Sequence, residues 1–378
     1  MKILITRFLK ILALLLSVAL FLFFMQNYVF VYVDQNSERV HGFYQEETDS
    51  LDVVLMGASD VNTAFAPGLA YEKYGFTSYL YAFDANPGSL YKYQLKEILS
   101  TQNPQVILIE INGFLYPGDY QSTEVRLRLF TDNIPFSLNK LDVIYHYDVE
   151  NKVEYLFPLI KYHGDWIKGN KLLDTLRWRS TDGSKPALWK GVTACTLTRP
   201  FDPSVLKEPD PSNPNVTEFA EDYLIDFLEF CKKEGITNII FTRFPHRNYM
   251  AHTIKIDKIK YILAQYGYTF WNLEEKIDEI GLDLNTDFYD EEHVNIYGQE
   301  KMTAYIGNYL ISEVLDEPIP QSEENTNHWS ECIDAYKLFN AYARYMTENG
   351  IERWAAEEPY ELTFYQQWLD STDSKHIQ

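Results

Sequence analysis

The sequence predicts an α/β protein in which helices cover both faces of a parallel β-sheet. Short, continuous apolar runs recur along the chain and alternate with segments of helical pattern. A strand that is apolar at every position is buried on both sides, which is typical of parallel sheets. The first such run is Val53–Met56, and four more candidate strands follow at 78–83, 106–111, 238–242 and 268–273. Their alternation with helices predicts a single sheet of five parallel strands.

Two helices between or after these strands are well marked. Asn215, with Glu218 three positions later, resembles a capping box at a helix start. Large side chains then repeat every four residues up to Gly235. A second helix is expected over 296–310, where it would close the sheet.

An apolar run from Ile11 to Val33 precedes the predicted domain and contains no charged residue. As a helix it would extend about 34 Å, enough to cross a bilayer. It ends in large side chains and not in a small-residue cleavage site, so an uncleaved signal anchor is favoured over a cleaved signal peptide or a core helix. Lys2, Arg7 and Lys10 precede it, so the positive-inside rule predicts a single-pass cell-membrane protein with a cytoplasmic N-terminus.

The chain is expected to divide into several parts, and those after about Asp34 are expected to lie outside the cytoplasm. Residues 1–34 would form the cytoplasmic tip and transmembrane anchor, and 35–50 a polar stalk. The main domain is expected over 51–315. The alternation of strands and helices breaks over 113–214, which we interpret as a long insertion over the strand ends. A helical, aromatic-rich C-terminal extension is expected over 316–378.

Composition excludes some classes of function. The formal net charge of −22 would repel phosphate backbones, which argues against nucleic-acid binding. The three cysteines have no CxxC spacing, so neither a zinc site nor a disulfide framework is indicated. No metal-binding or nucleotide-binding motif is present, and no cofactor is expected. The aromatic share of 16% fits a carbohydrate-facing envelope protein and equally a tyrosine-rich core.

Chemistry-bearing residues follow the predicted strands. Ligands of open parallel sheets bind beyond the carboxyl ends of the strands. Ser59 comes two residues after the first strand and Asn112 directly after the third. His293, with Asp290 three positions before it, lies between the fifth strand and the last helix. A serine becomes a nucleophile when a base takes its proton and a third group orients that base.

Several of these residues also have purely structural interpretations. Ser59 fits the N-cap of the helix after the first strand, and His293 fits a surface or capping residue. His246, after the fourth strand, is a candidate substrate contact or a loop residue. Asp60 and Asn86 are further candidates for substrate binding.

Together these residues resemble the SGNH (GDSL-type) hydrolase superfamily. The resemblance is carried by Gly57–Ser59 after the first strand, the asparagine after the third, and Asp290–Gly298 before the last helix. The anchor and Tyr162–Trp166 resemble, more narrowly, envelope-anchored SGNH-like proteins of Gram-positive bacteria. These are similar to the D-alanyl-transfer protein of teichoic-acid synthesis and to the alginate acetyltransferase group. The resemblance covers about residues 50–117 and 236–312.

The resemblance implies a three-layer α/β/α, flavodoxin-like fold with a catalytic triad. Ser59 would be the nucleophile that takes an acyl group, His293 the general base and Asp290 the residue that orients it. The chain departs from the family at the first motif, which reads Gly-Ala-Ser-Asp and not Gly-Asp-Ser.

The family's oxyanion hole is formed by the N–H of the serine (here Ser59), a glycine after the second strand and an asparagine after the third. Asn112 matches the asparagine, although the usual Gly-x-Asn-Asp is here Glu110–Gly113. Gly88 is the nearest match to the glycine, and Asn86 is an alternative for that role.

The resemblance further implies an extracytoplasmic serine esterase or O-acyltransferase. Its substrate would be an acylated cell-envelope glycopolymer, either a polysaccharide or a teichoic-acid-like polymer, and a membrane-bound O-acyltransferase is a candidate partner. The alternative is a catalytically silent module of the same fold that binds envelope polymer or partner proteins. The departures from the family's motifs favour that alternative.

Overall fold

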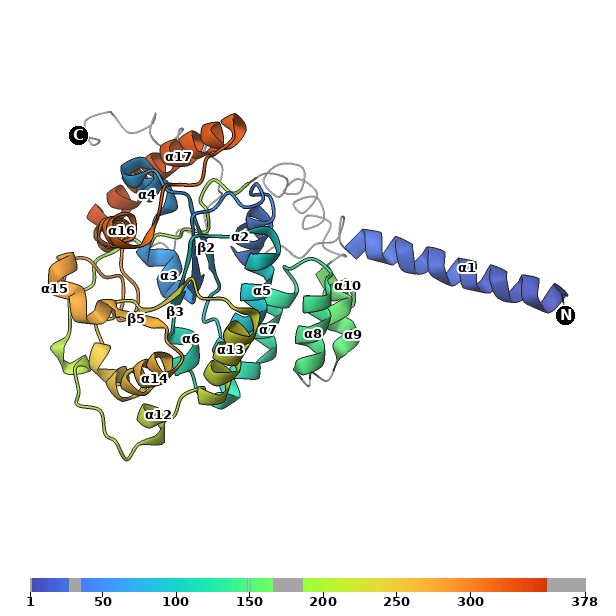
Figure 1. The fold of residues 1–378 in the computed structure, drawn as a ribbon, viewed down its shortest axis with the longest axis horizontal. Helices are drawn as coiled ribbons and strands as arrows, with labels where there is room; N and C mark the ends of the chain where they lie inside the picture. The colour runs from blue at the N-terminus through green and yellow to red at the C-terminus, as the bar shows by residue number, and fades with distance from the viewer. Residues whose placement is uncertain (1, 27–34, 148, 150, 166–185, 352–378) are drawn as a thin grey trace.

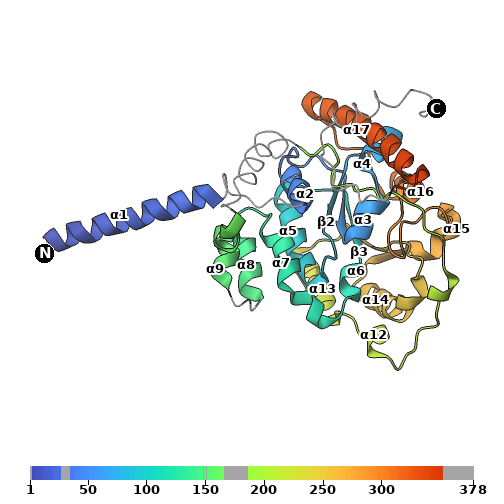
Figure 2. The ribbon, with the colours of Figure 1, turned by 180° about the vertical axis from the view of Figure 1, so that it is seen from behind.

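The computed structural model describes residues 2–26, 35–147, 149, 151–165 and 186–351 (Figure 1). A five-stranded sheet forms the centre of the main domain, helices lie on both of its faces, and helix α1 projects away from the domain (Figures 1 and 2). The predicted α/β class with one parallel sheet is therefore confirmed.

All five strands run in the same direction, in the order β2-β1-β3-β4-β5. The strands are β1 (Val53–Gly57), β2 (Ser78–Ala82), β3 (Val106–Glu110), β4 (Ile239–Arg243) and β5 (Thr269–Asn272). The chain passes from β1 to β2 on one side and then to β3 on the other. The carboxyl ends of β1 and β3 therefore lie at the point where the winding reverses, which is where ligands bind in such sheets.

Successive side chains of the strands enter two different cores. In β1, Val54 and Met56 belong to one core, while Val53 and Leu55 belong to the other. The first core is covered by α2 (Gln35–Phe43), α5 (Tyr91–Thr101), α13 (Glu221–Glu234) and α14 (Thr253–Gln265). The second is covered by α3 (Ser59–Ala64), α4 (Pro67–Tyr74), α16 (Ile296–Tyr309) and α17 (Glu323–Glu348). Burial on both faces explains why the strands are apolar at most positions, with polar residues mainly at the strand ends, such as Glu110 and Arg243 at the carboxyl ends of β3 and β4.

The expected stalk over 35–50 is wrong, because this segment is part of the domain. Helix α2 packs on the sheet, and Val40 and Phe43 are fully buried. The guanidinium group of Arg39 donates hydrogen bonds to the backbone carbonyls of Ala82 and Gly191. The segment looks polar in the sequence because its charged groups are satisfied inside the protein by partners far along the chain.

The helix expected to start near Asn215 begins later. Asn213 caps a short helix, α12 (Pro214–Thr217), by accepting a hydrogen bond from the Asn215 N–H. The chain then turns, and α13 starts at Glu221 after the N–H of Ala220 donates to a backbone carbonyl of the segment that follows β3. The capping-box prediction therefore marked a helical turn and not the start of the long helix.

In the described part of the chain, one helix is long and apolar enough to cross a membrane. This is α1 (Lys2–Phe24), in which the candidate span Ile3–Phe24 has 22 residues. It begins earlier than the charge-free run predicted, because Arg7 and Lys10 are included in the helix. The end of the predicted run, 27–33, lies outside the described residues.

The insertion is mainly helical up to residue 165, whereas its described part over 186–213 is mostly irregular. The α-helices of the first part are α6 (Asn112–Leu115), α7 (Glu124–Thr131), α8 (Leu138–His146), α9 (Lys152–Leu156) and α10 (Pro158–Lys161). Helices α8, α9 and α10 lie beside α5 (Figure 1). The Tyr162 hydroxyl donates to Asp132, so this part of the resemblance motif fastens the insertion to itself. Trp166 lies outside the described residues.

The predicted amphipathic C-terminal helix is α17. Trp329 is fully buried against Tyr71 of α4. The two helices approach closely at Gly68, where a Cβ atom would lie 2.9 Å from the Cys332 carbonyl oxygen. The expected aromatic tail beyond this helix lies outside the described residues, since they end at 351.

Candidate functional site

Ser59, His293 and Asp290 form a continuous chain of hydrogen bonds at the carboxyl edge of the sheet. The Ser59 Oγ atom is 2.9 Å from His293 Nε2. On the other side of the ring, His293 Nδ1 is 2.9 Å from Asp290 Oδ1 and 3.0 Å from Oδ2. A carboxylate only accepts hydrogen bonds, so Nδ1 carries the proton and the lone pair of Nε2 faces the serine hydroxyl. A general base needs this tautomer and this distance.

The serine stands at a tight junction between β1 and α3. Ala58, in an extended conformation, is the N-cap residue of α3, and Ser59 is the first residue of the helix. Ser59 is therefore not the N-cap, and its hydroxyl is left to meet the histidine. Gly57 is required at this junction, because a Cβ atom there would lie 2.6 Å from Val61 and 2.8 Å from the Cβ atom of Glu110.

A tight turn holds Asp290 against His293. The Oδ1 atom of Asp290 accepts hydrogen bonds from the backbone N–H groups of Glu292 and His293, both at 2.8 Å. The turn is closed by a hydrogen bond of 2.9 Å from the Tyr289 N–H to the His293 carbonyl. The carboxylate is thus fixed by the backbone as well as by the imidazole.

Arg247 ties this turn to the end of β4. Its backbone N–H donates to the Glu291 carbonyl at 2.8 Å, and its guanidinium group lies 3.0 Å from the Glu291 carboxylate. The same guanidinium group donates to the Arg199 carbonyl. Asn295, and not His293, caps α16, because its side chain accepts from the first N–H groups of that helix. Because Asn295 is the N-cap residue of α16, His293 has no capping role.

The turn and the burial of the site shift the pKa values of His293 and Asp290. Burial by itself lowers the pKa of His293, but the hydrogen bond and charge of Asp290 outweigh it, and the net shift of the pKa is upward. Burial raises the pKa of Asp290, yet the His293 hydrogen bond and the two backbone N–H groups lower the pKa to about 2. Asp290 is therefore ionised and stabilises the protonated form of His293.

A buried charged cluster lies next to the hydrogen-bonded chain. The Arg243 guanidinium bridges two carboxylates, at 3.2 Å from Glu110 and 2.9 Å from Glu274. His246 Nδ1 is 2.8 Å from the carbonyl oxygen of Phe244, two positions earlier, and 3.1 Å from Glu274. Burial and the charge of Arg243 lower the pKa of His246 to about 3. Glu110, Arg243 and Glu274 were not among the site residues predicted from the sequence. A charged residue at the end of an otherwise apolar strand, as in Glu110 and Arg243, was the available signal.

The residues expected to contact substrate are buried. Asp60 is 3% exposed, and His246 and Asn86 are each 1% exposed. Asp60 Oδ2 and His246 Nε2 face one another at 3.7 Å. A position at the correct edge of the sheet does not decide whether a side chain points outward, and these three point inward. The burial of these three side chains does not fit the prediction that they contact substrate.

The candidate oxyanion residues differ in how they are engaged. The Asn112 amide, 8% exposed, is 3.4 Å from the Tyr116 hydroxyl, and the Asn112 N–H donates to the Glu110 carboxylate. The Asn86 amide donates instead to the Gly57 carbonyl, at 2.8 Å. Gly88 packs under an aromatic ring, because a Cβ atom there would lie 2.3 Å from Phe114. Asn86 and Gly88 thus support the loops at the ends of β1 and β2.

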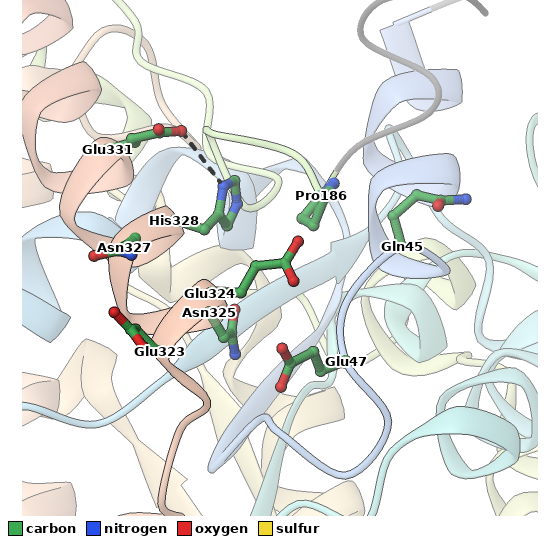
Figure 3. A pocket seen from close by; sticks show the side chains of 9 residues that line it. All are labelled: Gln45, Glu47, Pro186, Glu323, Glu324, Asn325, Asn327, His328 and Glu331. Atoms are coloured by element: carbon green, nitrogen blue, oxygen red, sulfur yellow. Dashed lines mark ion pairs between the residues drawn. The ribbon is translucent and has the colours of Figure 1, made fainter.

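A separate pocket of about 910 Å³ lies where the start of α17 faces residues 45–47 (Figure 3). Its lining is acidic, with Glu47, Glu323, Glu324 and Glu331, and His328 lies within 3.9 Å of Glu331. None of the predicted site residues lines it. Within the described ranges, no group of three or more acidic, histidine or cysteine side chains is placed to hold a metal ion.

Comparison with known proteins gives no family: no family model matches the chain, and no curated protein matches it. The fold and the site therefore define the protein. It is an α/β protein with a five-stranded parallel sheet and one N-terminal apolar helix. At the carboxyl edge of the sheet, a serine is hydrogen-bonded to a histidine, and the histidine is hydrogen-bonded to an aspartate.

Proposed function

We propose that this protein is a serine esterase or O-acyltransferase of the SGNH type that works through an acyl-serine intermediate. The observation that carries the proposal is the continuous hydrogen bonding from Ser59 through His293 to Asp290. These residues come from opposite ends of the domain, 234 positions apart for the serine and the histidine. Their approach to within 2.9 Å supports a catalytic pair over two independent structural roles.

In the proposed reaction the Ser59 Oγ atom attacks the carbonyl carbon of an acyl ester while its proton moves to His293 Nε2. The tetrahedral intermediate collapses, the bond to the alcohol breaks, and the alcohol leaves with the proton from Nε2. Water, or a hydroxyl group of an acceptor, then attacks the acyl-serine, and His293 again takes and returns the proton. Asp290 stays ionised and stabilises the imidazolium form in both steps.

The proposed substrate is an acylated glycopolymer of the cell envelope, of polysaccharide or teichoic-acid type. Helix α1 supports an envelope location, and the basic residues at its start favour an extracytoplasmic main domain. A membrane-bound O-acyltransferase in the same membrane is the proposed partner, since it would supply an acyl group on the correct side.

A fluorophosphonate probe tests the proposal, because it reacts covalently with an activated serine. The detergent-solubilised full chain is expected to be labelled, and Ser59→Ala is expected to lose the label. Ser312→Ala, which removes an exposed hydroxyl far from the site, is the matched control. Labelling that persists in Ser59→Ala, or is absent from the folded wild type, would contradict the proposal.

The pH dependence provides a second prediction. Protonated His293 cannot take the serine proton, so activity is expected to disappear as the pH falls through a pKa above the ordinary value of about 6.5. Glu292 contributes to this upward shift. Glu292→Gln is therefore expected to move the acid limb of the kcat/KM profile to lower pH, because it lowers the pKa of His293.

The control for the pH prediction is Glu313→Gln, which removes an exposed charge on another part of the surface. The two profiles, measured with a soluble acyl ester, should differ in the position of the limb. Coincident limbs for Glu292→Gln and Glu313→Gln would argue against His293 as the titrating base.

A catalytically silent module that binds envelope polymer is the alternative. The engagement of Asn86 and Gly88 in packing favours it, since both were candidates for the oxyanion hole. A folded protein that binds polymer equally well as wild type and as His293→Ala, and never reacts with the probe, would establish this alternative.

A further inference from the structure

Exposed apolar side chains gather on the insertion. In the described part of the chain beyond α1, eight large apolar side chains are exposed, and six of them lie between residues 125 and 160. Leu138 and Tyr145 of α8 are 84% and 80% exposed, and Val153 and Ile160 of α9 and α10 are 58% and 47% exposed. Such a concentration of apolar surface is unfavourable in water and indicates an interaction site.

The two most exposed of these residues lie on one side of α8. Leu138 and Tyr145 are seven positions apart on α8, and seven residues correspond to nearly two helical turns, so both lie on the same side. The opposite side of α8 is buried in the domain core through Val143 and Ile144. Helix α9 packs beside α8 and α10 packs beside α9, and each has a buried side chain on its inner side, Tyr155 and Leu159. The apolar face of the insertion is defined here as Phe136, Leu138, Tyr145, Val153 and Ile160.

This face begins where α1 leaves the domain. The Phe136 ring meets the Phe23 ring of α1 edge to face, with centroids 6.1 Å apart. The Gln26 side chain donates a hydrogen bond of 2.9 Å to the Leu156 carbonyl. Both views show α8 and α9 on the side of the domain from which α1 projects, and α1 runs outward from there, away from the domain (Figures 1 and 2). A bilayer crossed by α1 would therefore have its surface at these helices.

We propose that the apolar face of the insertion docks into the surface of the lipid bilayer that α1 crosses. Tyr145 and Lys152 have the chemistry of a membrane interface, because an aromatic ring and a long cationic side chain can place their polar ends among the headgroups. They already form a pair, with the Lys152 ammonium 4.7 Å from the ring centroid. Among the described residues of these helices and their neighbours, the carboxylates of Asp142, Glu124 and Glu154 are paired with Lys96, Lys161 and Arg128, respectively, which lessens their repulsion from an anionic surface.

Docking would fix the domain close to the membrane in one orientation. A single attachment to the membrane through α1 would leave the domain free to turn, whereas a second contact at α8, α9 and α10 removes that freedom. The proposal rests on α1 as a membrane span and is independent of the proposed chemistry at Ser59.

Spin labels in the full chain test the proposal, after reconstitution into liposomes of phosphatidylcholine and phosphatidylglycerol in equal amounts. The native cysteines Cys195, Cys231 and Cys332 are buried, so single cysteines are labelled selectively. Labels at Tyr145→Cys and Val153→Cys are expected to collide with oxygen more than with a polar nickel complex, with a ratio several-fold above that of an aqueous site.

Tyr261→Cys on α14 is the matched aqueous control, because this tyrosine is 68% exposed. Val18→Cys, within α1, reports whether the anchor is inserted. A lipid-exposed label at position 18 together with aqueous labels at 145 and 153 would overturn the proposal. Labels at 145 and 153 that are shielded from both reagents would also overturn it, because they would show that another protein covers this face.

Discussion

Replacing His293 with alanine is expected to slow turnover of an acyl ester by on the order of 10⁴- to 10⁶-fold. The reason is that His293 Nε2, 2.9 Å from Ser59 Oγ, is the group in position to take the serine proton. Because the two residues act as one unit, Ser59→Ala alone and the double variant are expected to show the same loss as His293→Ala. Initial rates with a chromogenic acetyl ester measure all three variants and the wild type.

The matched control for this prediction is His146→Ala, which removes an exposed histidine of α8. Its rate is expected to equal that of the wild type. The hydrogen-bonded chain would have no role in catalysis if His293→Ala lost less than about tenfold, or if the losses of the two single variants multiplied in the double variant.

Replacing Lys190 with methionine is expected to lower the free energy of unfolding by ~3–5 kcal/mol. Lys190 and Glu46 are both fully buried, and the ammonium group lies 2.6 Å and 2.8 Å from the two carboxylate oxygens. The same ammonium group lies 4.6 Å from the centroid of the Trp329 ring. Without it, the Glu46 carboxylate is left buried and unpaired, although burial already raises the pKa of Glu46. Denaturant unfolding of the detergent-solubilised chain measures the loss.

The double variant Lys190→Met with Glu46→Leu separates the ion pair from the packing. It is expected to recover much of the lost stability, since no charge then remains buried. Lys276→Met breaks an exposed pair with Glu279 and should leave the stability nearly unchanged. Equal losses in the single and double variants would show that the stability comes from side-chain packing alone.

The sheet could be predicted because its strands are apolar at nearly every position. Their burial is a property of each segment by itself, so Val53–Met56 and the runs that follow could be recognised one at a time. The pairing of Asp290 with His293 could also be predicted, because residues three positions apart can meet in a local turn. Their link to Ser59 followed from the rule that parallel strands share one carboxyl edge.

Residues whose role depends on distant partners could not be predicted in the same way. The polar segment 35–50 resembled a stalk because Glu46 meets Lys190 only after folding, 144 positions away. Arg247 lies next to His246 after β4, and its contacts with Glu291 form only because the end of β4 and the Asp290 turn meet in the folded protein. The sequence around a charged residue does not indicate which distant residue will pair with it in the folded protein.

The sequence by itself therefore determined the α/β class, the five strands, the N-terminal apolar helix and the identity of the Ser59, His293 and Asp290 group. Only the tertiary structure decided which side chains at the strand ends face inward, as Asp60, His246 and Asn86 do. It also decided that the insertion carries its apolar face beside α1. The physical reason is that hydrophobic patterning and tight turns act between neighbours in the chain, whereas burial direction and charge pairing are settled between segments that meet only in the folded state.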